Sequence, residues 1–166
     1  MLRDLYRMGF DPRLQADEVP DHAGFAAADD VKAERALIGD ADVFAFVYPL
    51  WFNAPPAMLK GYIDRVFGMG FGYGMGQGGN RPLLTGRRMI SITSSGAPSR
   101  WLEQTGAWEA IRNLFDEHLA AVCGFTLVGH VHFDGITPGI TEEAVEQCAN
   151  AVKAAVARLQ VAALAP

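Results

Sequence analysis

The stretch Val43–Phe67, VFAFVYPLWFNAPPAMLKGYIDRVF, decides the fold because it predicts a strand, a turn and a helix in immediate succession. Its first six residues, Val43–Tyr48, form an apolar run rich in β-branched and aromatic side chains, which is typical of a strand buried on both faces of a parallel sheet. The run stops at Pro49, which cannot donate to a sheet ladder. After Pro55-Pro56, apolar residues follow helical spacing at Met58, Leu59, Ile63, Val66 and Phe67.

The turn Trp51-Phe52-Asn53 lies between this strand and this helix. In open α/β sheets, ligands bind beyond the carboxyl ends of the strands, so two large aromatic side chains at such a place predict a flat, π-rich ligand. The alternative is that Trp51 and Phe52 only cover the core. These residues alone favour neither interpretation.

A second apolar strand, Met89–Thr93, ends in the small-residue turn Ser94–Ser99. Small side chains let a ligand approach the backbone, and their hydroxyl and N–H groups offer hydrogen bonds to carbonyls or ring nitrogens. The alternative is an ordinary strand-to-helix turn in which Ser99 caps the following helix.

The other elements complete an alternating pattern. Asp29-Asp30 caps a predicted helix that ends at Ile38, Phe125–Phe133 is a third predicted strand, and Thr141 begins a final helix. The pattern predicts an α/β fold with a doubly wound parallel sheet, in one domain with a polar connector over residues 1–30 and a core over 31–166. Trp101–Val122 is predicted as one long helix that buries Leu102, Trp108, Ile111, Leu114, Phe115, Leu119 and Val122.

The segment 68–80 has glycine at nearly every second position. A phosphate-binding glycine loop follows a strand and precedes a helix, whereas here a helix precedes and Arg81-Pro82 follows. We interpret the segment as a mobile loop that places Phe71 and Tyr73 in one wall of a pocket. A surface loop without function is the alternative.

Composition excludes several functions. The net charge of −5 and the absence of a basic run argue against nucleic acid or an anionic membrane as partner. No apolar stretch reaches the ~20 residues that span a bilayer, and the two cysteines, Cys123 and Cys148, fit reduced thiols, so we expect a cytoplasmic protein. His130 and His132 share one side of the third strand but lack a carboxylate or cysteine cluster, which favours a structural or solvent-facing role over a metal site. No nucleophile motif is present, which indicates chemistry carried by a bound cofactor.

The segment Tyr48–Val66, YPLWFNAPPAMLKGYIDRV, resembles the NAD(P)H:quinone oxidoreductase family of flavodoxin-like flavoproteins, which carry an aromatic-Pro-Leu-x-aromatic loop, then Pro-Ala-x-Leu-Lys-Gly and Asp/Glu-Arg-Val. The similarity continues through Gly70–Tyr73, Ser91–Gly96 and Val122–Phe125. The resemblance implies a homodimer with FAD or FMN, a ping-pong cycle, hydride from NAD(P)H, and a quinone or related two-electron acceptor. It places the flavin ring against Pro49, Leu50, Trp51, Phe52, Asn53, Thr93, Ser94, Ser95 and Gly96, and the substrate beside Phe71 and Tyr73 across the dimer interface.

The sequence also departs from the family. A histidine that helps to shuttle protons in mammalian-type members falls near Thr105 here, so no catalytic base is assigned, and Met75 replaces a second tyrosine, so quinone specificity does not carry over. The family's first strand, its phosphate-binding loop and its second strand have no counterpart, so we expect an N-terminally incomplete fold and a native protein with an N-terminal extension, visible in its mass. Two further hypotheses are a regulatory subunit of the potassium-efflux type and a flavin-free remnant.

Overall fold

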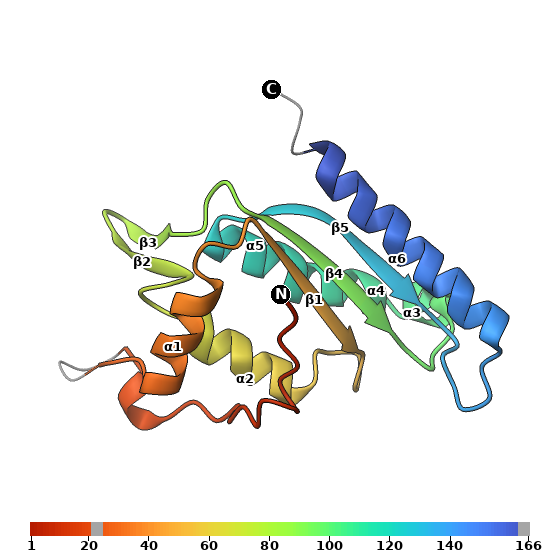
Figure 1. The fold of residues 1–166 in the computed structure, drawn as a ribbon, viewed down its shortest axis with the longest axis horizontal. Coiled ribbons are helices and arrows are strands. Elements are labelled where there is room, and N and C mark those ends of the chain that lie inside the picture. Colours follow the sequence, from red (N-terminus) through yellow and green to blue (C-terminus); the bar gives the residue numbers. More distant parts are fainter. Residues whose placement is uncertain (21–24, 163–166) are drawn as a thin grey trace.

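The computed structural model describes residues 1–20 and 25–162 and shows a parallel sheet with helices on both faces (Figure 1). The sheet order is β1-β4-β5. The predicted alternation of helices and strands is therefore confirmed. Its elements are α1 (Asp29–Ile38), β1 (Val43–Pro49), α2 (Ala57–Val66), β4 (Arg88–Ser94), β5 (Thr126–Phe133) and α6 (Glu142–Ala162).

The three strands end side by side. Pro49 of β1 pairs with Ser94 of β4, which pairs with Phe133 of β5. Because parallel strands present their carboxyl ends at the same edge of a sheet, the loops after β1, β4 and β5 gather there. This edge is where the sequence places its candidate ligand.

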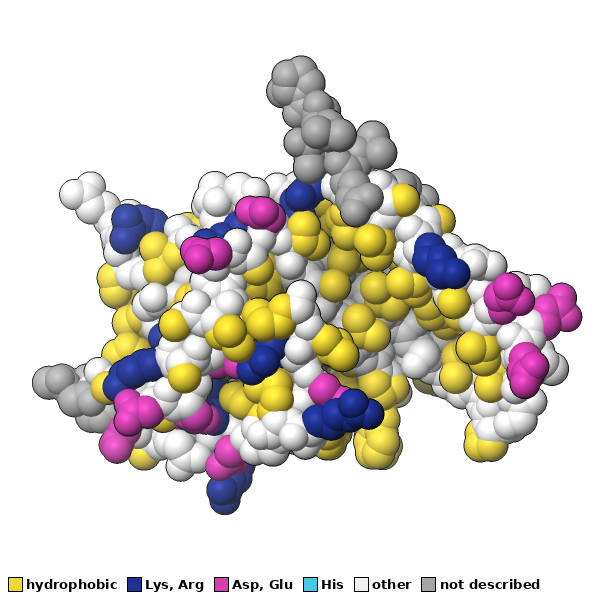
Figure 2. All heavy atoms as spheres, viewed as in Figure 1, with side chains coloured by type: hydrophobic (Ala, Val, Ile, Leu, Met, Phe, Trp, Pro, Cys, Tyr) yellow, Lys and Arg dark blue, Asp and Glu magenta, His cyan; other side chains and the backbone are white. Residues whose placement is uncertain are grey.

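The prediction that the first strand is buried on both faces is wrong for β1. Phe44, Phe46 and Tyr48 are buried in the main core, whereas Ala45, Val47 and Pro49 on the other face are exposed. Helix α6 covers that second face mainly over β4 and β5, where Ile90, Ile92, Ala155 and Leu159 form a smaller core that reaches β1 only at Val43. Figure 2 shows the apolar side chains left open on this side of the molecule, next to α6.

The helix predicted over Trp101–Val122 is interrupted, so that prediction is also wrong. Gly106 adopts a left-handed φ of 70°, which ends the first turn of helix. A π-helical segment then widens the backbone turn, so Leu114 is exposed and Asp116 is fully buried instead. The four pieces are α3 (Ser99–Gln104), α4 (Ala107–Ile111), the π-helix η2 (Arg112–Glu117) and α5 (His118–Cys123).

The glycine-rich segment was predicted as a loop but forms an antiparallel hairpin of β2 (Tyr73–Gly76) and β3 (Gly79–Pro82). Gly78 and Gly79 have φ values of 90° and 136°, which glycine adopts readily at a tight turn. The pairing is local, from Gly76↔Gly79 outward to Tyr73↔Pro82, but glycine-rich composition does not predict strands, and this is why the segment was interpreted as a loop.

The N-terminal connector is fastened to α1 and α2 by a cluster that we call the arginine clasp, made of Arg65, Glu18 and Asp30. Arg65 lies 2.9 Å from Glu18 and 2.8 Å from Asp30, and only 4% of its surface is exposed. A β-carbon on Gly61 would lie 2.0 Å from the carbonyl oxygen of Pro12, so α2 needs glycine where the connector crosses it. The connector also includes the short 3₁₀ helix η1 (Ala16–Glu18).

Candidate functional site

Two turns meet at the carboxyl edge of the sheet. The turn after β1 is tied to the turn after β4 because the Leu50 N–H donates to the Ser94 carbonyl oxygen at 2.7 Å. The structure therefore brings together the two groups of residues that the sequence predicts around one ligand, Pro49–Asn53 and Thr93–Gly96.

The turn after β1 holds its aromatic side chains outward. Trp51 and Ala54 exchange two backbone hydrogen bonds of 3.0 and 3.1 Å around Phe52 and Asn53, whose φ values are 49° and 57°. Two positive φ values in this position define a type I′ turn, which favours Asn-Gly and is strained for phenylalanine. Trp51 is 66% exposed and Phe52 is fully exposed, so neither ring covers the core.

Asn53 anchors this turn to the start of α4. Its Nδ2 donates to the carbonyl oxygen of Ala107 at 2.9 Å. Its Oδ1 is buried and has no hydrogen-bond partner among the described residues. A buried acceptor without a partner is costly, so this oxygen is a place where a ligand donor would be favourable.

The turn after β4 offers backbone donors rather than side chains. Within the described residues, the N–H groups of Gly96 and Ala97 donate no hydrogen bond, while the Ser95 N–H is occupied by the carbonyl oxygen of Phe133. The Thr93 side chain is 1% exposed. A ligand at this turn therefore meets the backbone of Gly96 and Ala97 first.

The alternative interpretation of this turn, in which Ser99 caps the following helix, is wrong in detail. Pro98 occupies the cap position of α3 and makes no side-chain cap hydrogen bond. Instead, the Ser99 N–H donates to Asp134 Oδ2 at 2.6 Å, and this bond holds the pKa of Asp134 below its ordinary value. The loop after β5 is thus joined to the loop after β4.

Behind the second turn, the His130 side chain is buried, at 3% exposed, and the partly buried His132 lies beside it. Both rings contact the hydroxyl of Thr93, at 2.6 and 2.8 Å, and both pack against the Trp108 ring. His130 also pairs with Asp116 at 2.6 Å. Sequence reasoning missed Asp116, because no local signal places a carboxylate on the buried side of that helix. No group of three metal-ligating side chains occurs within residues 1–20 and 25–162.

Phe71 and Tyr73 lie at the opposite end of the sheet. Phe71 packs against Phe67, which in turn contacts Phe44 near the start of β1. Figure 1 shows the β2-β3 hairpin on that side, away from the tip of the β1 arrow. Within one chain, the structure does not bring these two residues to the aromatic turn.

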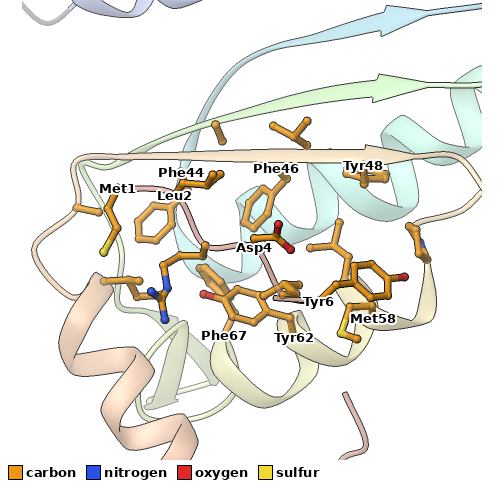
Figure 3. Close-up of a pocket in the computed structure, with 18 of the residues that line it drawn as sticks. Met1, Leu2, Asp4, Tyr6, Phe44, Phe46, Tyr48, Met58, Tyr62 and Phe67 are labelled. Carbon is orange, nitrogen blue, oxygen red and sulfur yellow. The ribbon is translucent and has the colours of Figure 1, made fainter. Parts of the chain in front are cut away.

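A groove of about 540 Å³ runs along β1 rather than over the two turns. Its walls are the rings of Phe44, Phe46 and Tyr48, the helix α2 and the N-terminal segment from Met1 to Tyr6 (Figure 3). The groove is open because β1 pairs only with β4 in the described part of the chain, which leaves its other edge without a strand partner.

The residues present at the two turns fit the ring of a flavin. Exposed Trp51 and Phe52 provide flat apolar surfaces, and the free N–H groups of Gly96 and Ala97 provide donors for ring carbonyls. The buried Asn53 Oδ1 provides an acceptor for a ring N–H. A flat heterocycle with a polar rim meets all three requirements.

Comparisons with known proteins show the family of the chain. Residues 1–156 match the model of a family described by its flavodoxin-like fold. An uncharacterized NAD(P)H oxidoreductase of Haemophilus influenzae is 33% identical over 135 residues, which cover 78% of this chain and 67% of the relative. The potassium-efflux ancillary protein KefG of Cronobacter sakazakii is 36% identical over a shorter stretch of 91 residues, or 52% of this chain and 47% of the relative.

Solved structures similar to this chain include an NAD(P)H oxidoreductase and a protein in complex with FMN. The NAD(P)H:quinone oxidoreductase of Methanothermobacter marburgensis superposes with a TM-score of 0.77 at 30% identity, covering 92% of this chain and 79% of that one. General stress protein 14 of Treponema denticola, in complex with FMN, has a TM-score of 0.61 at 25% identity, covering 81% and 74%. The chain spans about half the length of several of the curated relatives it matches. In the described part of the chain, no helix is long and apolar enough to cross a membrane.

Proposed function

Because the chain belongs to the flavodoxin-like family, we propose that it is a flavin-dependent NAD(P)H oxidoreductase that reduces a quinone or a similar two-electron acceptor. The observation that carries the proposal is the junction of the two turns, where exposed aromatic rings lie next to free backbone donors. A flavin supplies hydride transfer when it is bound, and the protein supplies position and surroundings.

The residues of the two turns divide the binding of the ring between them. Trp51 and Phe52, with the backbone of Pro49 and Leu50, would hold its apolar surface, and Asn53 would accept from its polar rim. The turn Thr93–Gly96 would donate to its carbonyls through the backbone, because the Thr93 hydroxyl is already bonded to two imidazoles. FMN is the first flavin to test, since a structural neighbour is in complex with it.

Phe71 and Tyr73 support a homodimer as the working form. They lie at the far end of the sheet from the ring turns of their own chain. A second copy would have to supply them if they contact the substrate. We place this dimer in the cytoplasm, where Cys123 and Cys148, both free thiols, remain reduced.

The test is reconstitution with flavin. Purified protein is incubated with FMN or FAD, and its visible spectrum, its affinity for flavin and its turnover of NADH or NADPH with a quinone are measured. Replacing Trp51 with alanine should weaken flavin binding about tenfold, the effect of losing one stacked ring. Leu37→Ala removes an exposed apolar side chain on α1, far from the turns, and should leave flavin binding unchanged.

The outcomes separate the hypotheses. A protein that takes up neither flavin contradicts the proposal and favours a flavin-free remnant. A protein that binds flavin but reduces no quinone with either nucleotide favours an ancillary subunit, the role named for the KefG relative.

A further inference from the structure

Behind the turn after β4 lies an unbranched series of five hydrogen bonds that we call the imidazole relay, made of Asp116, His130, Thr93, His132 and Ser95. These side chains come from η2, β4, β5 and the turn after β4, and Asp116 and Thr93 are almost completely buried. The bonds join Asp116 Oδ2 to His130 Nδ1 (2.6 Å), His130 Nε2 to Thr93 Oγ1 (2.6 Å), Thr93 Oγ1 to His132 Nδ1 (2.8 Å), His132 Nε2 to Ser95 Oγ (3.1 Å) and Ser95 Oγ to the Ala97 carbonyl oxygen (2.9 Å).

The number of protons in this series is fixed by its two ends. The Ala97 carbonyl can only accept, and so can the Asp116 carboxylate, which also accepts from Ser91 Oγ at 2.6 Å. Five hydrogen bonds in series need five protons. Neutral His130, Thr93, His132 and Ser95 carry one each, which makes four. The imidazole relay is therefore complete only when it holds one proton more than its neutral side chains.

We propose that the imidazole relay stores this additional proton and delivers it through Ser95 to the ligand at the turn after β4. The proposal rests on the proposed function. Reduction of a quinone to a hydroquinone adds one hydride and one proton. NAD(P)H gives the hydride and becomes NAD(P)⁺, and the imidazole relay gives the proton. The Ser95 hydroxyl turns from the Ala97 carbonyl toward the ligand as the proton leaves.

The surroundings favour one proton in the pair of imidazoles and oppose a second. The buried Asp116 carboxylate faces His130, whose side chain is 3% exposed, so a single positive charge there is balanced. Burial and the charge on His130 lower the pKa of His132, although Asp134 acts in the opposite direction. Tyr48 of β1 stays neutral, because burial and the nearby Asp116 charge raise its pKa.

Solvent can restore the proton from the other side. His132 lines a cavity of about 330 Å³ at the end of β5, together with Asp134 and residues of α6 such as Cys148. After Ser95 has given up a proton, water in this cavity can recharge His132. Solvent thus reaches the imidazole relay at the same residue that passes the proton to Ser95.

A matched pair of variants tests the proton count. Thr93→Val removes the hydroxyl but keeps the shape, which leaves three hydrogen bonds, and neutral His130, His132 and Ser95 supply three protons. The additional proton should therefore be released, whereas Thr93→Ser should retain it. Ser95→Ala removes the last two hydrogen bonds of the series and also leaves three, so it should release the additional proton as well. It replaces Thr93→Val as the test if the valine variant does not fold.

The readout does not need flavin. In ¹⁵N-labelled full-length protein without cofactor, imidazole NMR at neutral pH should show one imidazolium shared between His130 and His132 in the wild type and in Thr93→Ser, and none in Thr93→Val. Exposed His118 is the internal reference, and its signals should be the same in all three proteins. Two neutral imidazoles in the wild type, with signals that Thr93→Val leaves unchanged, would overturn the proposal.

Delivery of the proton is tested separately in flavin-loaded protein. Thr93→Val should lower kcat about 100-fold and remove the pH dependence that the NMR titration assigns to the imidazole pair, with KM for NAD(P)H unchanged. An unchanged kcat overturns delivery. A protein that passes the NMR test but binds no flavin contradicts the proposed function and leaves proton storage established.

Discussion

The arginine clasp, in which Arg65 and Glu18 are buried, and the imidazole relay both place charged and polar groups inside the protein, yet they differ in what they can change. At physiological pH Arg65 stays protonated and its partners Glu18 and Asp30 stay ionised and only accept, so the clasp has one protonation state there. The imidazole relay is built from imidazoles and hydroxyls, each of which can both donate and accept.

The arginine clasp and the imidazole relay also differ in where they lie. The arginine clasp joins three segments of backbone, and Arg65 donates its remaining hydrogen bond to the Asp11 carbonyl oxygen. The imidazole relay ends at Ser95, one residue before the free N–H groups of Gly96 and Ala97. Burial of charge therefore does not by itself identify a functional site. A functional site is better identified by a cluster whose protonation state can change and which lies next to an open surface of hydrogen-bond donors.

The largest effect is expected from breaking the arginine clasp. Arg65→Met leaves Glu18, which is 7% exposed, as a buried carboxylate without a charged partner. Such a loss typically costs about 3–5 kcal/mol of unfolding free energy. Urea denaturation measures it, and the midpoint should fall sharply while the slope stays constant.

The control for this variant is Arg13→Met. Arg13 pairs with Asp11 at 2.8 Å, but its side chain is 81% exposed, so water replaces the partner when the pair is broken. The denaturation midpoint should barely move. If the two variants lose similar stability, burial of the arginine clasp is not what makes it important.

A smaller effect separates the two clusters by pH. His132 has a pKa below its ordinary value, because burial and His130 oppose its charge. Below about pH 6.5 the unfolded chain therefore binds more protons than the folded protein, and the free energy of unfolding should fall as the pH falls further. Burial raises the pKa of Glu18, but the hydrogen bonds and charge of Arg65, together with backbone N–H donors such as that of Gln15, outweigh it, and the same arginine lowers the pKa of Asp30. Their contribution should be lost only below about pH 4.5.

Thermal unfolding between pH 7 and pH 3 should therefore show two declines. His132→Gln should remove the upper one and Arg65→Met the lower one. A single decline that both variants shift together would mean that the two clusters are coupled, which contradicts their separation in the structure.

Much of this arrangement could be predicted because it depends on local sequence. The apolar runs that become β1 and β4 and the small-residue turn at Ser94 each lie within a few neighbouring residues. The aromatic turn was placed correctly for the same reason. What local sequence could not provide was the backbone conformation of Phe52 and Asn53, which depends on closure of the turn by Trp51 and Ala54.

The imidazole relay could not be predicted because its members meet only through tertiary structure. Asp116 is 14 residues from His130 and 25 from Ser91 in sequence. It faces inward because η2 is π-helical, whereas regular helical spacing predicts that Leu114 is buried. The apolar run of β1 does not state how many neighbours the strand has, but the missing counterpart of the family's first strand predicted an incomplete sheet, and β1 is at its edge.

The smallest effect is expected at the aromatic turn, where binding and stability should separate. Phe52 is fully exposed and has a φ of 49°, so its ring adds no packing while its backbone is strained. Asparagine tolerates this conformation, so Phe52→Asn should raise the unfolding free energy by about 1 kcal/mol and weaken flavin binding. Phe52→Ala removes the ring without relieving the strain, so it should weaken binding equally and leave stability unchanged. A loss of stability in both variants would show that the ring supports the fold, and the strain could then no longer be attributed to a ligand site.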